Sequence, residues 1–149
     1  MVYASWGVVC WLPDVTRWAR VVARCLRPGG TFLLAEHHPL WESLVLTPGG
    51  VAVTGDYFGR NSPAPTPPHW SKAVSGAPVA DDAVLFRWPV GDVVTALVES
   101  GLQIRRLEEH ALPDMYLSAL SALTVAARAS ADRLPAVYLV LADKPGTVL

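Results

Sequence analysis

The sequence has little of several features that mark special classes of protein. Its two cysteines, Cys10 and Cys25, stand in apolar surroundings, which indicates buried thiols in a reducing compartment rather than a disulfide framework. No uncharged stretch reaches the ~20 apolar residues of a membrane-spanning helix. No basic segment stands before the first apolar stretch, residues 1–13, as it would in a signal peptide. We therefore expect a cytoplasmic protein with no membrane partner.

Charge is also scarce. Charged residues make up 17% of the chain, and the formal net charge is −1. The arginines and lysines form no basic stripe of the kind that binds nucleic acid. The histidines lack the spacing of metal ligands, and the adjacent His37 and His38 would point to opposite faces of a strand. The sequence predicts neither a nucleic-acid surface nor a metal site.

Apolar residues make up 52% of the 149 residues, enough for a single domain over residues 1–149 with a substantial core. The chain is organised around residues 24–40. A helix is predicted over 14–26, with Asp14 as its N-cap and apolar residues at helical spacing. Pro28 and Gly29 predict a type II turn with positive φ at Gly29. A buried strand over 31–37 follows and ends in a polar cluster.

The other elements are read with the same rules. Residues 41–89 form a long, irregular, proline-rich insertion in which residues 51–54 and 84–86 could be short strands. A lid and a partly disordered segment both remain open for it. The remaining predicted elements are strands at 2–4, 102–107 and 136–142, helices at 90–100 and 113–131, and an apolar loop or short helical turn at 8–12. The fold class is therefore α/β.

Three motifs carry a family resemblance. The run L-R-P-G-G-x-F-x-L-x-E, from Leu26 to Glu36, resembles the turn between the fourth helix and fifth strand of the class I S-adenosylmethionine-dependent methyltransferases. The runs V-Y-A-S-W-G and W-L-P-D, at residues 2–7 and 11–14, resemble that family's fourth strand and the loop after it. The resemblance implies a three-layer, partial Rossmann-like sheet whose strands are equivalent to 4-5-7-6 of the family order.

The family's cofactor signature is absent from this sequence. That signature is a glycine-rich loop after the first strand and an acidic residue that ends the second strand and holds the ribose. Here the pairs Gly29-Gly30 and Gly49-Gly50 stand in turns elsewhere. The chain thus resembles the carboxyl-terminal half of a methyltransferase, and its binding of S-adenosylmethionine is in doubt on this ground.

The resemblance also implies site residues. Ala4, Ser5, Trp6 and Gly7 would lie along the methionine portion of the cofactor. Glu36 would face the substrate, and His37 or His38 would act as a catalytic base, since histidine titrates near neutral pH. For Glu36 the alternative is pairing with an arginine or with backbone. For the histidines it is capping of the sheet edge.

Aromatic residues add two candidates for a substrate pocket, Trp41 and Tyr57, with core packing as the alternative for each.

Three functions are therefore open. The first is a methyltransferase acting on a small molecule, present here as a carboxyl-terminal fragment whose activity when isolated is left open. The second is a non-catalytic interaction module or partner subunit, and the third is an unrelated α/β binding protein. Because the strand at 2–4 would be an open sheet edge in a charge-free segment, we expect a homo-oligomer or a complementing chain.

Overall fold

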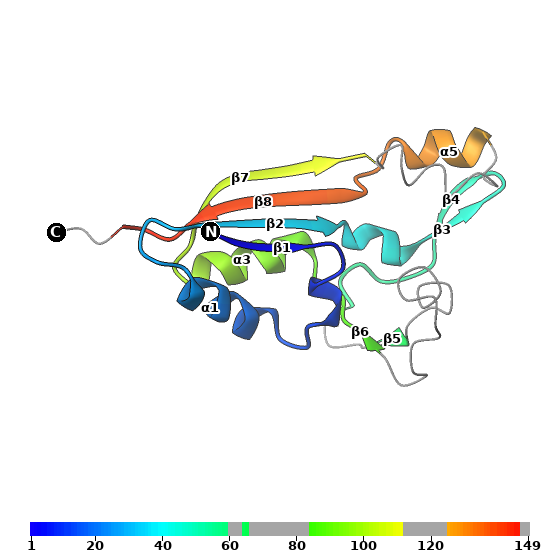
Figure 1. Ribbon diagram of the computed structural model, residues 1–149. Helices are drawn as coiled ribbons and strands as arrows, with labels where there is room; N and C mark the ends of the chain where they lie inside the picture. Colours follow the sequence, from blue (N-terminus) through cyan, green and yellow to red (C-terminus); the bar gives the residue numbers. More distant parts are fainter. Residues whose placement is uncertain (60–63, 66–83, 112–124, 147–149) are drawn as a thin grey trace, which may run out of the picture.

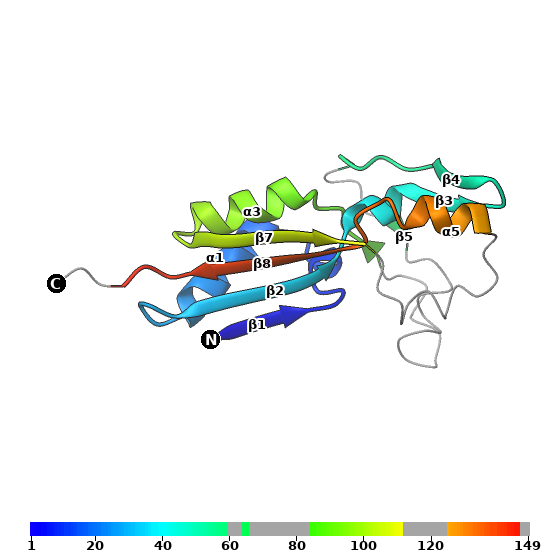
Figure 2. The ribbon, with the colours of Figure 1, turned by 90° about the horizontal axis from the view of Figure 1, so that it is seen from above.

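The fold, a computed structural model that describes residues 1–59, 64–65, 84–111 and 125–146, is built on one four-stranded sheet (Figures 1 and 2). In sheet order, its strands are β1 (Val2–Ser5), β2 (Thr31–His37), β8 (Val137–Asp143) and β7 (Gln103–His110). β1 pairs with β2 in parallel, and β8 pairs antiparallel with both β2 and β7. This arrangement confirms the predicted order, in which the strands are equivalent to 4-5-7-6.

Two helices cover one face of this sheet, α1 (Val15–Cys25) and α3 (Val90–Glu99) (Figure 1). The α1 helix starts where predicted because the Asp14 carboxylate accepts a hydrogen bond from the Arg17 amide at 2.8 Å. The α3 helix ends before Gly101, whose φ of +85° is the left-handed conformation expected of a helix stop. The helices predicted over residues 14–26 and 90–100 are therefore confirmed.

The core lies between these helices and alternate residues of the two central strands. The side chains that face the helices are all at most 1% exposed: Phe32, Leu34, Tyr138, Val140 and Ala142. Leu33, Leu139 and Leu141 point to the opposite face and are only partly buried. The described residues thus supply two of the three layers that the resemblance implies.

The turn between α1 and β2 follows the prediction. The Gly30 amide donates to the Arg27 carbonyl at 2.8 Å, and Gly29 has a φ of +75°, so Pro28 and Gly29 are the central residues of a type II turn. A Cβ at Gly30 would lie 2.8 Å from the Arg27 oxygen. The Lys144 ammonium donates to the carbonyls of Ala23 and Leu26 and so caps the end of α1.

The segment predicted to be irregular contains regular elements. In chain order these are the 3-10 turn η2 (Pro39–Ser43) and the strands β3 (Leu44–Thr47), β4 (Gly50–Val53), β5 (Ala64–Pro65) and β6 (Val84–Leu85). The hairpin β3–β4 and the helix α5 (Val125–Ala131) lie beyond the carboxyl ends of β1 and β2 (Figures 1 and 2). The predicted helix at 113–131 lies outside the described residues except for its end, which α5 occupies.

Three smaller expectations need comment. The predicted turn at 8–12 is the 3-10 helix η1 (Val9–Trp11). The strand predicted over 102–107 extends to His110, and a register shift between Ile104 and Arg106 marks a bulge where two charged residues interrupt the alternation. Cys25 is exposed, so its prediction as a buried thiol was wrong. No helix in the described ranges has the length and apolar character that crossing a bilayer requires.

We predict that Gly29→Val destabilises the fold more than Gly49→Val. A Cβ would meet no atom within 4 Å at either glycine, but only Gly29 has a positive φ. The two variants therefore differ in backbone strain alone, which should cost Gly29→Val about 1–3 kcal/mol of unfolding free energy. Chemical denaturation measures both, and equal midpoints would refute the prediction.

Candidate functional site

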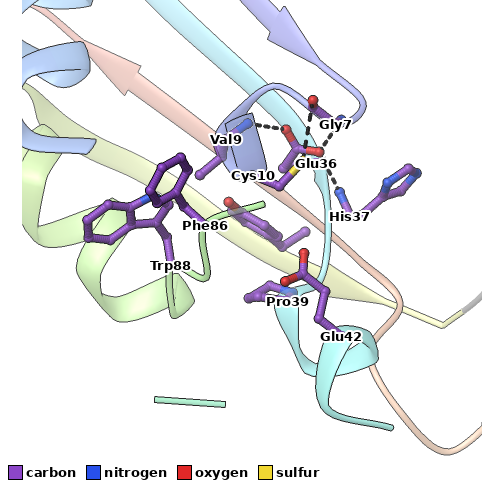
Figure 3. A pocket seen from close by; sticks show the side chains of 10 residues that line it. Gly7, Val9, Cys10, Glu36, His37, Pro39, Glu42, Phe86 and Trp88 are labelled. Atoms are coloured by element: carbon purple, nitrogen blue, oxygen red, sulfur yellow. Dashed lines mark hydrogen bonds between the residues drawn. The ribbon is translucent and has the colours of Figure 1, made fainter. Parts of the chain in front are cut away.

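A small pocket lies where β1 and β2 end. Because these strands are parallel, their carboxyl ends meet at one edge of the sheet, and η1 and η2 follow them directly (Figure 1). Figure 3 shows the side chains that line the pocket. They are Gly7, Val9, Cys10, Glu36, His37, Pro39, Glu42, Phe86, Trp88 and Tyr138. The cavity volume is about 20 Å³, enough for one or two water-sized groups.

Glu36 is the most highly bonded side chain at this edge. It is 4% exposed, and its carboxylate accepts hydrogen bonds from four backbone amides. Their donors are Gly7, Val8 at 2.7 Å, Val9 at 3.1 Å and His37 at 2.9 Å. These bonds tie the segment after β1 to the end of β2. The carboxylate of Glu36 thus pairs with backbone, which is the alternative that the sequence left open, and the residue also lines the pocket.

The backbone before these amides has an unusual conformation. Trp6 and Gly7 have φ values of +52° and +81°. Residues in the left-handed region turn successive N–H groups toward one point and form an anion-binding concavity. Trp6 is the one non-glycine residue with positive φ among those described, and the carboxylate of Glu36 fills the concavity.

His38 is buried, and both of its ring nitrogens are engaged. Nδ1 accepts from the Leu40 amide at 3.2 Å, so Nε2 carries the proton and donates to the Glu109 carboxylate at 2.8 Å. Burial lowers the pKa of His38, and the Glu109 carboxylate opposes this effect. A neutral imidazole with both nitrogens bonded has no site for a substrate proton, so this geometry argues against the predicted catalytic role of His38.

His37 lies on the opposite face of β2 and packs against Trp6, with ring centroids 5.4 Å apart. Burial lowers its pKa, and the neighbouring Glu36 opposes this effect, so the ring is neutral at pH 7. Figure 3 shows the imidazole turned away from Trp88 and Phe86. His37 thus keeps a protonation state suited to a base, at the rim of the pocket.

Glu42 and Arg87 were missed by the sequence reasoning. The Glu42 carboxylate lies 3.8 Å from Arg87 Nε, and both side chains are about one-fifth exposed. Burial raises the pKa of Glu42 to about 7, Arg87 opposes the shift, and Glu36 adds to it. One signal was available, since Glu42 is the only acidic residue between Glu36 and Asp56. Nothing local in the sequence pointed to Arg87.

The thiol of Cys10 lies in the same pocket. Burial raises the pKa of Cys10 to about 12, with further contributions from the carboxylates of Glu42 and Glu36. The thiol is therefore protonated at neutral pH, and its sulfur lies 3.6 Å from the Gly7 carbonyl oxygen. In the described ranges, no three acidic, cysteine or histidine side chains gather as they would around a metal ion.

The residues predicted to contact cofactor are divided between the pocket and its surroundings. Of the four expected to contact cofactor, Gly7 lines the pocket, whereas Ala4 packs against the core and Ser5 pairs with Ala35. The fourth is Trp6, 45% exposed at the rim.

The two aromatic candidates for the substrate pocket do not line it. The Trp41 indole N–H donates to the Pro135 carbonyl at 2.8 Å. The Tyr57 hydroxyl accepts from the Val90 amide at 3.2 Å, and its ring stacks on His38. Both aromatic residues therefore anchor loops next to the site.

We predict that Glu36→Gln strongly destabilises the protein, because the neutral amide presents an NH₂ group to backbone donors that need an acceptor. Hydrogen bonds to a charged group are worth about 1.5–3 kcal/mol each, so a total loss of about 2–4 kcal/mol is expected. Glu99→Gln, at the exposed end of α3, is the matched control. Thermal and urea unfolding provide the measurement, and a variant as stable as the control would contradict the anchoring role.

Comparison with known proteins points to one fold family. No protein-family model and no curated protein matches the sequence. A solved S-adenosylmethionine-dependent methyltransferase from Mesorhizobium loti is 26% identical, with a TM-score of 0.61, and the match covers 95% of this chain and 59% of that one.

A protein from Listeria monocytogenes assigned to the same class of enzyme is 16% identical, with a TM-score of 0.65, and the match covers 96% of this chain and 60% of that one. The chain thus spans about 60% of the length of these two structures. Together with the strand order β1-β2-β8-β7, these similarities show that the chain has the fold of the class I S-adenosylmethionine-dependent methyltransferases.

Proposed function

We propose that the chain forms the substrate side of an S-adenosylmethionine-dependent methyltransferase that acts on a small molecule. The observation that carries this proposal is the group of titratable side chains at the carboxyl ends of β1 and β2, within a methyltransferase fold. Ligands of open α/β sheets bind at this edge. Methyl transfer needs a nucleophile held in line with the methyl group, and often a proton acceptor beside that nucleophile.

One part of the described chain fits the cofactor. Gly7 lines the pocket in a left-handed conformation, and a Cβ added there would meet no protein atom within 4 Å. This open space allows a ligand to approach the backbone closely. We propose that residues 4–7 lie along the methionine end of S-adenosylmethionine, which supplies the methyl group when bound. His37 and Glu42 are the two side chains of the pocket that can accept a substrate proton.

We predict that this polypeptide binds S-adenosylmethionine more weakly than micromolar, because its sequence lacks the glycine-rich loop and the ribose carboxylate. Gly7→Val should remove the residual binding, since its side chain would occupy the open space, whereas Gly29→Val, which carries the same positive-φ strain outside the pocket, should leave it unchanged. Isothermal titration calorimetry provides the measurement. Micromolar affinity in the unmodified chain would sink the prediction.

A second function, as an interaction module or partner subunit, is favoured by the open edge of the sheet. β1 pairs only with β2 among the described strands. Tyr3 is 54% exposed, and residues 1–12 hold no charge or proline that would discourage pairing with another chain. We propose that this edge pairs with a second copy or with a complementing chain. The cytoplasmic location expected from the sequence remains a prediction.

We predict that the protein is a dimer or larger assembly at tens of micromolar, joined through the edge of β1. Tyr3→Lys places a charge on that edge and should shift the population toward monomer. The control is Val53→Lys, at the 77% exposed end of β4, which should leave the assembly intact. Multi-angle light scattering reads the mass, and a monomeric unmodified chain would count against the proposal.

A further inference from the structure

We propose that Glu42 accepts the proton of the substrate's nucleophilic group and that Arg87 positions the Glu42 carboxylate for this task. The inference rests on the proposed function, for which it names a residue and a chemical step. It starts from the geometry of the pocket, where Figure 3 shows the Glu42 carboxylate extending from η2 toward the ends of β1 and β2.

Glu42 and Arg87 form an ion pair without a hydrogen bond, although both side chains are largely buried. Its 3.8 Å separation is too long for a hydrogen bond. Arg87 Nε is buried and has no hydrogen-bond partner in the described structure. Buried polar groups are normally bonded, and exceptions call for an explanation such as a catalytic role. The carboxylate therefore keeps lone pairs available for a group that enters the pocket.

Other titratable and charged groups surround the pocket together with Glu42, from each element packed around it. They are Cys10 on η1, Glu36 and His37 on β2, Arg87 after β6 and Tyr138 on β8. Glu36 is occupied by four backbone donors. Burial raises the pKa of the Cys10 thiol to about 12 and raises the pKa of the Tyr138 phenol, so both stay protonated at neutral pH.

His37 is the competing proton acceptor. Its ring packs on Trp6 at the rim, away from the aromatic wall that Phe86 and Trp88 form. Glu42 lies inside the pocket, and burial raises its pKa to about 7, so it can take up a proton near neutral pH. Its position and its protonation state together favour Glu42 over His37 as the proton acceptor.

The size of the cavity limits what enters it. A volume of about 20 Å³ has room for about one water-sized group, such as a hydroxyl or an amino group. The nucleophile's lone pair forms the bond to the methyl carbon, its proton passes to Glu42, and the sulfur of S-adenosylmethionine keeps the electron pair of the broken bond. The inference therefore specifies a substrate with a protic oxygen or nitrogen nucleophile.

The first test needs no cofactor. Side-chain carboxyl ¹³C shifts are followed by NMR from pH 4 to 9 in the full chain, with Glu42→Gln to assign the resonance. We expect a midpoint near 7, which rises in Arg87→Met because the guanidinium charge favours the ionised carboxylate. A midpoint below 5, or no change in Arg87→Met, would overturn the assignment of Glu42 as proton acceptor with Arg87 as its positioning residue.

The second test measures methyl transfer from millimolar S-adenosylmethionine to small phenols and primary amines. Glu42→Gln should lower kcat about 100-fold or more and remove the acid limb of the pH profile, as loss of a general base costs about 10²–10⁴-fold. His37→Gln should retain that limb. The opposite pattern would transfer the role to His37. If the unmodified chain shows no turnover, the proposed function of the isolated chain fails, and the NMR midpoint alone upholds or overturns Glu42.

Discussion

The bonds between the Glu36 carboxylate and four backbone amides hold this edge of the molecule together. Three of the donors, Gly7, Val8 and Val9, belong to the segment that leaves β1, whereas Glu36 ends β2. A parallel strand pair has no hairpin to join its carboxyl ends, so their loops need another link. A carboxylate that accepts several N–H bonds is such a link, and it also compensates the left-handed backbone at Trp6, which is costly for a side chain with a Cβ.

The same link determines where chemistry can occur. Once the segment after β1 is fixed on Glu36, η1 places Cys10 opposite η2, and the loop after β6 closes the pocket with Phe86 and Trp88. The Trp88 indole N–H donates to the Leu12 carbonyl at 2.7 Å, and the Phe86 amide donates to the Cys10 carbonyl at 2.7 Å. These two hydrogen bonds hold the loop after β6 against the segment that contains η1, although the two are distant in the sequence. The pocket wall that Phe86 and Trp88 form is therefore positioned by a loop that hydrogen bonds fix in place, and not by a helix or strand of its own.

Sequence reasoning succeeded where local rules decide the structure. The α1 helix was predictable from apolar spacing and the Asp14 cap, and β2 from a turn that needs positive φ at Gly29. The sheet order came from the family resemblance. The hairpin β3–β4 was only partly foreseen, because four-residue strands carry too short an alternation to distinguish them from loops.

The site was less predictable because its chemistry depends on partners far away in the chain. His38 is a plausible base in the sequence, and only the fold brings Glu109 to its Nε2 and leaves its Nδ1 facing the Leu40 amide. Glu36 and Glu42 stand near each other in the sequence and line the same pocket. The surroundings of their carboxylates nevertheless differ. Glu36 accepts four backbone hydrogen bonds, whereas Glu42 lies 3.8 Å from a single guanidinium, and burial raises the pKa of Glu42. One carboxylate thus anchors the backbone, and the other is the group for which we propose proton transfer.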